Sequence, residues 1–122
     1  MILQRLALRA AIACALFAVA PAAPARADMV GKVSFYGTES GRVTANGERF
    51  NPAGPTCAHW TLPFGTRLRV EDIDTGRSVI CRVNDRGPHP RLHRLLDLSH
   101  GRAAALGVLH RGVFTARVSI IR

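Results

Sequence analysis

The sequence lacks the features that define several large protein classes. Its longest uncharged apolar run covers eleven residues, 10–20, whereas a membrane-spanning helix needs about 20. CxxC pairs and paired Cys/His spacings are both absent, so we expect no metal site and no cofactor. Acids are scarce, with 8 Asp and Glu against 17 Lys and Arg. Chemistry that needs a carboxyl group therefore has few candidates.

The first 27 residues have the layout of a cleavable secretory signal. Arg5 and Arg9 precede or adjoin the apolar run, and Ala25-Arg26-Ala27 puts small residues at the two positions that a signal peptidase reads. A buried N-terminal helix is the alternative, but no later segment repeats this composition. Cys14 lies within the apolar run rather than at its end, so we expect no lipid attachment there. The sequence thus predicts a periplasmic or secreted protein that is not held in the membrane after cleavage.

Residues 28–122 are expected to form a single domain of 95 residues. Without Arg5, Arg9 and Arg26 it keeps 14 basic residues against all 8 acids, a net charge of +6. A basic domain suits anionic partners such as wall polymers, lipid head groups or nucleic acid. The exported location argues against nucleic acid. Charge alone does not choose among the remaining partners, and the alternative is a charge that serves solubility and attraction to an acidic envelope. We expect a monomer.

Two cysteines, Cys57 and Cys81, lie in this domain, 24 positions apart. An oxidising compartment permits a disulfide bond between them, and two buried free thiols are the alternative. Closing such a loop is worth roughly 3 kcal/mol in the chain-entropy model. We expect the bond, because a domain of this size has only a marginal core.

Most of the domain consists of short strand-like runs separated by turn residues. Alternating apolar and polar side chains predict strands over 67–71 and 78–83, joined by a hairpin turn at 74–76. Further strands are expected at the ranges 30–37, 95–98 and 113–121. The segments 38–58 and 84–90 are predicted to be loops, and a loop as long as the first usually either carries function or is disordered.

One short helix is expected after the strand at 95–98. Ser99 is a suitable N-cap, residues 102–106 favour helix, and Gly107 can take the left-handed position that ends it. About six short strands and one helix point to a mainly β protein, a small closed barrel. Closure also removes the exposed edges of the sheet.

Five segments carry glycines and polar residues that a barrel wall does not need. They are Ser34-Phe-Tyr-Gly37, Thr44-Ala-Asn-Gly-Glu48, Cys57-Ala-His59 with Leu62-Pro-Phe-Gly-Thr66, Val83-Asn-Asp-Arg-Gly-Pro88, and Asp97-Leu-Ser99. In this order and spacing, over about residues 33–121, they resemble the RlpA (rare lipoprotein A) family. The resemblance implies a six-stranded double-psi β-barrel. It also implies action on peptidoglycan as a lytic transglycosylase, which cleaves the MurNAc–GlcNAc strand without water and leaves a 1,6-anhydro-MurNAc end.

The alternative function is a non-catalytic, expansin-like module that binds peptidoglycan or loosens the wall. Expansins share the double-psi fold, so the same polar groove could grip a glycan without cutting it. Two expected departures from the family keep this alternative open: we expect no acylated cysteine and no appended C-terminal glycan-binding domain of the kind that many RlpA proteins carry. A third class, an inhibitor or effector that binds another protein, has no positive support in the sequence.

Cleavage of a glycan strand needs at least one well-placed carboxyl group. The leaving oxygen must be protonated and the sugar's 6-hydroxyl deprotonated, and one carboxyl group can do both in turn. The acids Glu71, Asp72 and Asp74 lie in or beside the hairpin turn, where we expect them to be solvated. Glu48, Asp85 and Asp97 remain as candidates.

The resemblance implies Glu48, His59 and Asp85 as the catalytic residues. Each also has a structural interpretation. Glu48 could be a solvated loop acid, and His59 could be a packed polar residue that holds its loop. Asp85 could pair with Arg86, and an adjacent positive charge lowers an acid's pKa unless burial offsets it. Asp97 resembles the Asp of a similar expansin motif and could equally be a structural acid near the helix start.

The candidate glycan contacts are Tyr36, Asn46, Trp60, Arg86 and Asp97. Aromatic faces stack on sugar rings, and an arginine can bind the lactyl or peptide carboxylates of peptidoglycan. Tyr36 and Trp60 could equally fill the core.

Overall fold

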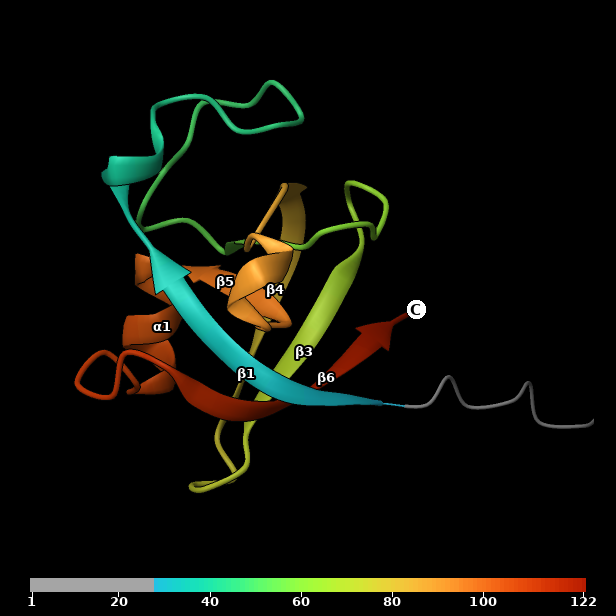
Figure 1. Cartoon of the computed structure of the whole chain (residues 1–122), viewed down its shortest axis with the longest axis vertical. Coiled ribbons are helices and arrows are strands. Elements are labelled where there is room, and N and C mark those ends of the chain that lie inside the picture. The colour runs from blue at the N-terminus through green and yellow to red at the C-terminus, as the bar shows by residue number, and fades with distance from the viewer. Residues whose placement is uncertain (1–27) are drawn as a thin grey trace, which may run out of the picture.

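Residues 28–122, apart from the side chain of Ser40, are described by the computed structural model, so the predicted signal at 1–27 lies outside the described residues. Six strands form a closed barrel in the order β1-β5-β2-β4-β3-β6 (Figure 1). The elements are β1 (Met29–Tyr36), β2 (Thr56–Ala58), β3 (Arg67–Asp72), β4 (Ser78–Asp85), β5 (Leu96–Ser99), α1 (His100–Leu106) and β6 (Phe114–Ile121), with 3-10 turns at Thr38–Ser40 and Pro90–Leu92. In this part of the chain no helix is long and apolar enough to cross a membrane.

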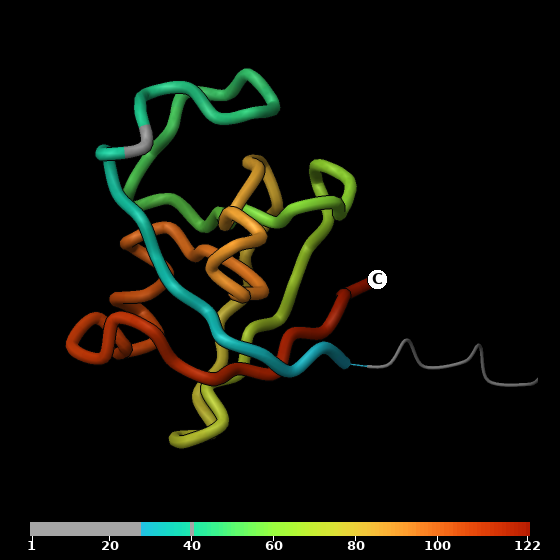
Figure 2. Tube along the Cα trace, in the orientation of Figure 1, coloured from blue at the N-terminus to red at the C-terminus, as the bar shows by residue number. Residues whose placement is uncertain are grey.

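The strand order brings segments that are far apart in the sequence side by side. The pairs β1–β5 and β2–β4 are parallel, and the other four neighbouring pairs are antiparallel. The long loop after β1 and the loop between β2 and β3 lie at one end of the barrel, whereas the β3–β4 hairpin turn lies at the other (Figures 1 and 2). Strand β4 runs from the hairpin turn toward the loop end, so its last residues lie beneath the loops.

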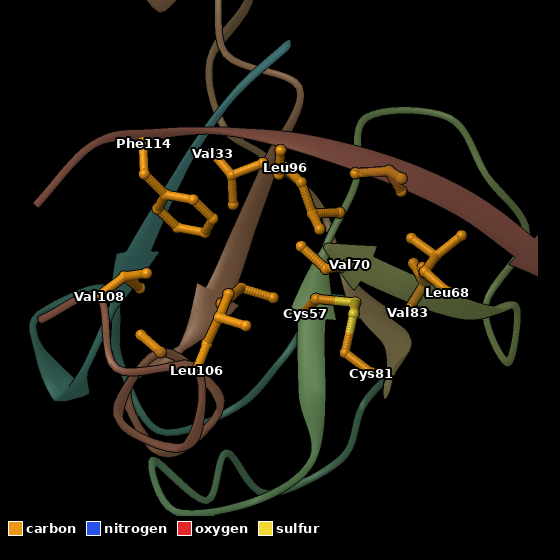
Figure 3. Close-up of a cluster of buried hydrophobic side chains, with 14 residues drawn as sticks. Val33, Cys57, Leu68, Val70, Cys81, Val83, Leu96, Leu106, Val108 and Phe114 are labelled. Carbon is orange, nitrogen blue, oxygen red and sulfur yellow. A yellow bond between two sulfur atoms is a disulfide. The ribbon is translucent and has the colours of Figure 1, made fainter. Parts of the chain in front are cut away.

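Buried aliphatic side chains fill the barrel (Figure 3). Leu68 and Val70 on β3 point inward, while Arg67 and Arg69, which alternate with them, are exposed; this confirms the period-two prediction. Cys57 and Cys81 form the expected disulfide inside this core, with their Cα atoms 5.7 Å apart. The core therefore combines strand alternation with one covalent link between β2 and β4.

The helix begins and ends where the sequence predicts. The Ser99 hydroxyl accepts a hydrogen bond from the Arg102 N–H at 3.2 Å and donates one to the Gly54 carbonyl at 2.6 Å. Gly107 takes the left-handed conformation, with φ of 80°, and its N–H bonds to the carbonyls of the last turn. These local contacts fix α1 directly after the last residue of β5, Ser99.

Two predictions about loops and turns are wrong. Residues 56–58, assigned to a loop, form β2; all three are buried, and a strand of three residues is too short to show a period. Asp72, expected to be solvated, is fully buried. It accepts hydrogen bonds from the Arg111 guanidinium and, at 2.8 Å, from the Thr75 hydroxyl. The hairpin turn is thus held by the segment before β6, and Arg111 compensates the buried charge.

Candidate active site

A β-bulge at the loop end of β4 sets the direction of the candidate carboxyl groups. Cys57 pairs with Val83, but the next residue, Ala58, pairs with Asp85, so Asn84 is the extra residue. On its other side Ala58 pairs with Asp97 of β5. Neighbouring strands are about 4.8 Å apart, so the Cα atoms of Asp85 and Asp97 lie about 10 Å apart. The small Ala58 side chain separates the two acids.

The two acids line one cleft of about 130 Å³, together with Tyr36, Val43, Ala58 and Arg86. The fold brings these residues together from four strands, β1, β2, β4 and β5, from the loop after β1 and from the loop after β4. Val43 on that loop is 67% exposed and forms the outer lip. A cleft with two carboxyl groups and a phenol can hold a polar ligand and exchange protons with it.

Three donors fix the Asp85 carboxyl group. The buried Tyr36 hydroxyl donates to Oδ2 at 3.0 Å, and the backbone N–H groups of Ala45 and Arg86 each donate to Oδ1 at 2.9 Å. Burial, followed by the charge of Asp85, raises the pKa of Tyr36 far above its usual range, so the phenol remains a donor. Tyr36 also stacks on Phe50, with ring centroids 4.9 Å apart. It is therefore both a buried residue and a wall of the cleft.

Asp97 has a different environment from Asp85. It lies opposite Ser34 in the parallel β1–β5 register, and the Ser34 hydroxyl donates to its Oδ1. Burial raises the pKa of Asp97, although Ser34 and the charge of Arg94 oppose this effect. Asp97 thus retains a proton to higher pH than an exposed aspartate. Ser34 belongs to a motif noted in the sequence, but only the register shows that it contacts Asp97.

Glu48 is not among the residues that line this cleft. Both its carboxylate oxygens bind the Arg82 guanidinium, at 2.5 and 2.9 Å, and the Asn46 amide donates to Oε1 at 2.6 Å. The Arg82 hydrogen bonds, followed by that of Asn46, lower the pKa of Glu48 to about 2. Glu48 is therefore ionised at neutral pH and suits a charge-holding role rather than proton donation. The ion pair with Arg82 holds the loop that follows β1 against β4.

Asn46 and His59 also shape loops around the cleft. The Asn46 side-chain amide donates to Glu48, and the Asn46 backbone N–H donates to the Asn84 backbone carbonyl at 3.2 Å. These two bonds secure the loop that carries Ala45. His59 is buried, and its Nδ1 accepts the N–H groups of Thr61 and Leu62 at 3.1 and 3.0 Å.

Burial, then the charge of Arg86, lowers the pKa of His59, which keeps the ring neutral. Its side-chain contacts therefore shape the loop that follows β2.

Arg86 and Trp60 are the remaining candidate contacts. Arg86 donates to the carbonyls of His59 and Leu62, at 3.2 and 2.7 Å, and its guanidinium lies 4.0 Å from the centroid of the Phe64 ring. Trp60 is half exposed, so it is not a core residue, and its ring centroid lies 6.2 Å from that of His89. Of these groups, Arg86 lines the cleft directly, and Phe64 lies against its guanidinium.

A family model described as "Lytic transglycolase" matches residues 28–118. This chain belongs to the lytic transglycolase family. Endolytic peptidoglycan transglycosylase RlpA of Pseudomonas aeruginosa (strain PAO1) is 50% identical over 93 residues, 75% of this chain and 26% of that protein. RlpA of Vibrio cholerae is 40% identical over 94 residues, 75% of this chain and 35% of that protein. These likenesses confirm the resemblance to RlpA, although the chain spans only about a quarter to a third of these relatives.

A solved structure supports the fold of this family member independently. Streptomyces papain inhibitor matches with a TM-score of 0.64 and 25% sequence identity, over 81% of this chain and 98% of that one. The match confirms the double-psi β-barrel that the sequence resemblance implied.

Proposed function

We propose that residues 28–122 form a lytic transglycosylase that acts on peptidoglycan in the periplasm or outside the cell, after removal of residues 1–27. The observation that carries this proposal is the pair Asp85 and Asp97, which face one cleft across Ala58 in different environments. Two carboxyl groups in such unlike surroundings can take different roles, one in proton transfer and the other in charge stabilisation. Family membership and the names of the RlpA relatives support the same reaction.

In the reaction we propose, Asp97 donates its proton to the glycosidic oxygen as the bond to the muramic sugar breaks. Asp85 stabilises the positive charge that develops at C1 of that sugar. The Asp97 carboxylate then takes the proton of the sugar's own 6-hydroxyl, whose oxygen attacks C1 and closes the 1,6-anhydro ring. The proton returns to Asp97, no water is consumed, and one carboxyl group serves as acid and then as base.

The other two residues predicted to be catalytic, Glu48 and His59, hold the loops around the cleft. Glu48 with Arg82 holds the loop whose Ala45 N–H reaches Asp85, and His59 shapes the loop whose carbonyls hold Arg86. We therefore propose Glu48 and His59 as positioning residues. Their loss should reduce turnover through a misplaced Asp85 or Arg86.

Trp60 and Arg86 supply the main proposed contacts with the glycan. Trp60 offers an exposed ring face on which a sugar can stack, and Arg86 presents a cation at the cleft wall. Asn46 contributes through the loop that it holds. Tyr36 contacts the Asp85 carboxyl group and borders the bound sugar.

Digestion of purified sacculi tests the activity. The wild-type domain should release 1,6-anhydromuropeptides, detected by mass spectrometry, and Asp85→Asn or Asp97→Asn should each abolish them. Asp74→Asn is the matched control, because Asp74 is an exposed acid of the hairpin turn at the opposite end of the barrel. Folded wild-type protein that releases no anhydro product from intact or peptide-stripped sacculi would refute the proposal. Binding without release would instead identify the expansin-like module.

A second candidate arises from the structural neighbour, whose name describes a papain inhibitor. An inhibitor of this kind would bind a protease through its loops and would not need the acid pair. A papain assay separates the two functions: we expect no inhibition by the wild-type domain. Inhibition that survives Asp85→Asn and Asp97→Asn would favour the inhibitor function.

A further inference from the structure

A second hollow lies on the outer wall of the barrel, over β3 and β4. Two adjoining cavities share Ile80 and Arg102. The first also contacts Arg69 and Ile121, and the second contacts Arg67 and Arg82. We call this surface, defined by Arg67, Arg69, Ile80, Arg82, Arg102 and Ile121, the arginine groove. None of these residues lines the acid cleft.

The positive charge of the arginine groove is poorly compensated. Arg67 lies directly opposite Arg82 in the β3–β4 register, and like charges at such positions repel each other. Glu48 binds Arg82, but no ion pair within residues 28–122 involves Arg67, Arg69 or Arg102. The Arg102 Nε is buried without a hydrogen-bond partner in the described chain. The groove therefore has free capacity for an anion.

The groove also contains apolar surface. Ile80 lies between the arginines and is 42% exposed, and Ile121 borders it from β6. A ligand that carries methyl groups beside carboxylates matches both parts, because the guanidinium groups bind carboxylates and the isoleucines cover the methyl groups.

The arginine groove and the acid cleft both contain residues of β4. Arg82 precedes Asp85 by three positions, a distance of about 10 Å along a strand. A long substrate that is held in the cleft can therefore reach the groove as well.

We propose that the arginine groove is a second binding site for the peptidoglycan strand, which holds carboxylate groups of the strand outside the cleft. This inference rests on the proposed function for the identity of the polymer. Peptidoglycan carries carboxylates next to methyl groups in two places: the lactyl ether of the muramic sugar and the stem peptide. The lactyl carboxylate is free only where the peptide has been removed. Both sources offer the chemistry that the groove recognises.

Binding to sacculi, measured by co-sedimentation at low temperature and short times, tests the site. The variant Arg67→Gln/Arg69→Gln should raise Kd roughly 3- to 10-fold, as expected for two exposed charge contacts. The matched control is Arg77→Glu, which removes the same two units of charge from the hairpin turn and should leave Kd unchanged. Ile80→Glu, which puts a negative charge in the groove, should also raise Kd.

Two preparations distinguish the source of the carboxylate. If the double variant binds peptide-stripped sacculi more weakly than the wild-type domain does, the groove binds the lactyl carboxylates. If it binds only intact sacculi more weakly, the groove binds the stem-peptide carboxylates. Unchanged Kd values on both preparations would overturn the inference, as would an equal loss for Arg77→Glu. Anhydro product release is measured separately. Arginine-dependent binding without product would refute the lytic function alone, and product with arginine-independent binding would refute the groove alone.

Discussion

Tyr36→Phe isolates the contribution of one hydrogen bond to the proposed chemistry. The substitution removes the hydroxyl that donates to Asp85 at 3.0 Å and keeps the ring that stacks on Phe50. A hydrogen bond to a charged group contributes about 1.5–3 kcal/mol. Two backbone donors still hold Asp85, so we take the lower end, about 1.5 kcal/mol. Since about 1.4 kcal/mol corresponds to a factor of ten, kcat should fall roughly tenfold.

The assay is the initial rate of anhydromuropeptide release, with thermal unfolding measured on the same preparation. Phe50→Leu is the control, because it removes the stacking partner and keeps the hydroxyl. We expect Phe50→Leu to lower Tm while it preserves more of the activity than Tyr36→Phe does. Full activity of Tyr36→Phe would refute the role of this hydroxyl in holding Asp85. A rate loss that simply follows Tm in both variants would assign Tyr36 to stability alone.

Three further changes test the cleft, the covalent link and the proton donor. Ala58→Leu should fill the space between the two acids and abolish product release while the protein remains folded by circular dichroism; retained activity would show that substrate does not pass there. Cys57→Ala/Cys81→Ala should lower the free energy of unfolding by about 3 kcal/mol, measured in urea, and an unchanged value would contradict the chain-entropy estimate. If Asp97 donates the proton, the rate should fall as the pH rises through its raised pKa, because only the protonated form is active. A pH–rate profile that stays flat above the ordinary aspartate range would exclude this role.

Local signals predicted much of the barrel. The alternation in β3 and β4, the turn between them, the Ser99 cap and the Gly107 stop each depend on neighbouring residues, and the structure confirms them. Strand β2 was missed because its three residues form a strand only through their partners on β4 and β5. The burial of Asp72 was mispredicted for the same reason, because its ion-pair partner Arg111 lies 39 positions away in the sequence.

The candidate site shows the same division. The sequence by itself identified the polar motifs, the family and most residues around the cleft, because residue types and spacings are properties of the chain alone. The arrangement of these residues depends on register. A bulge in β4 and two strand pairings place Asp85 and Asp97 on either side of Ala58, while Ser34 meets an acid 63 positions away. Glu48, which looks catalytic in the sequence, is held by Arg82 from another strand. Only the tertiary structure decided these contacts, because each joins strands that are adjacent in the closed barrel and distant along the chain.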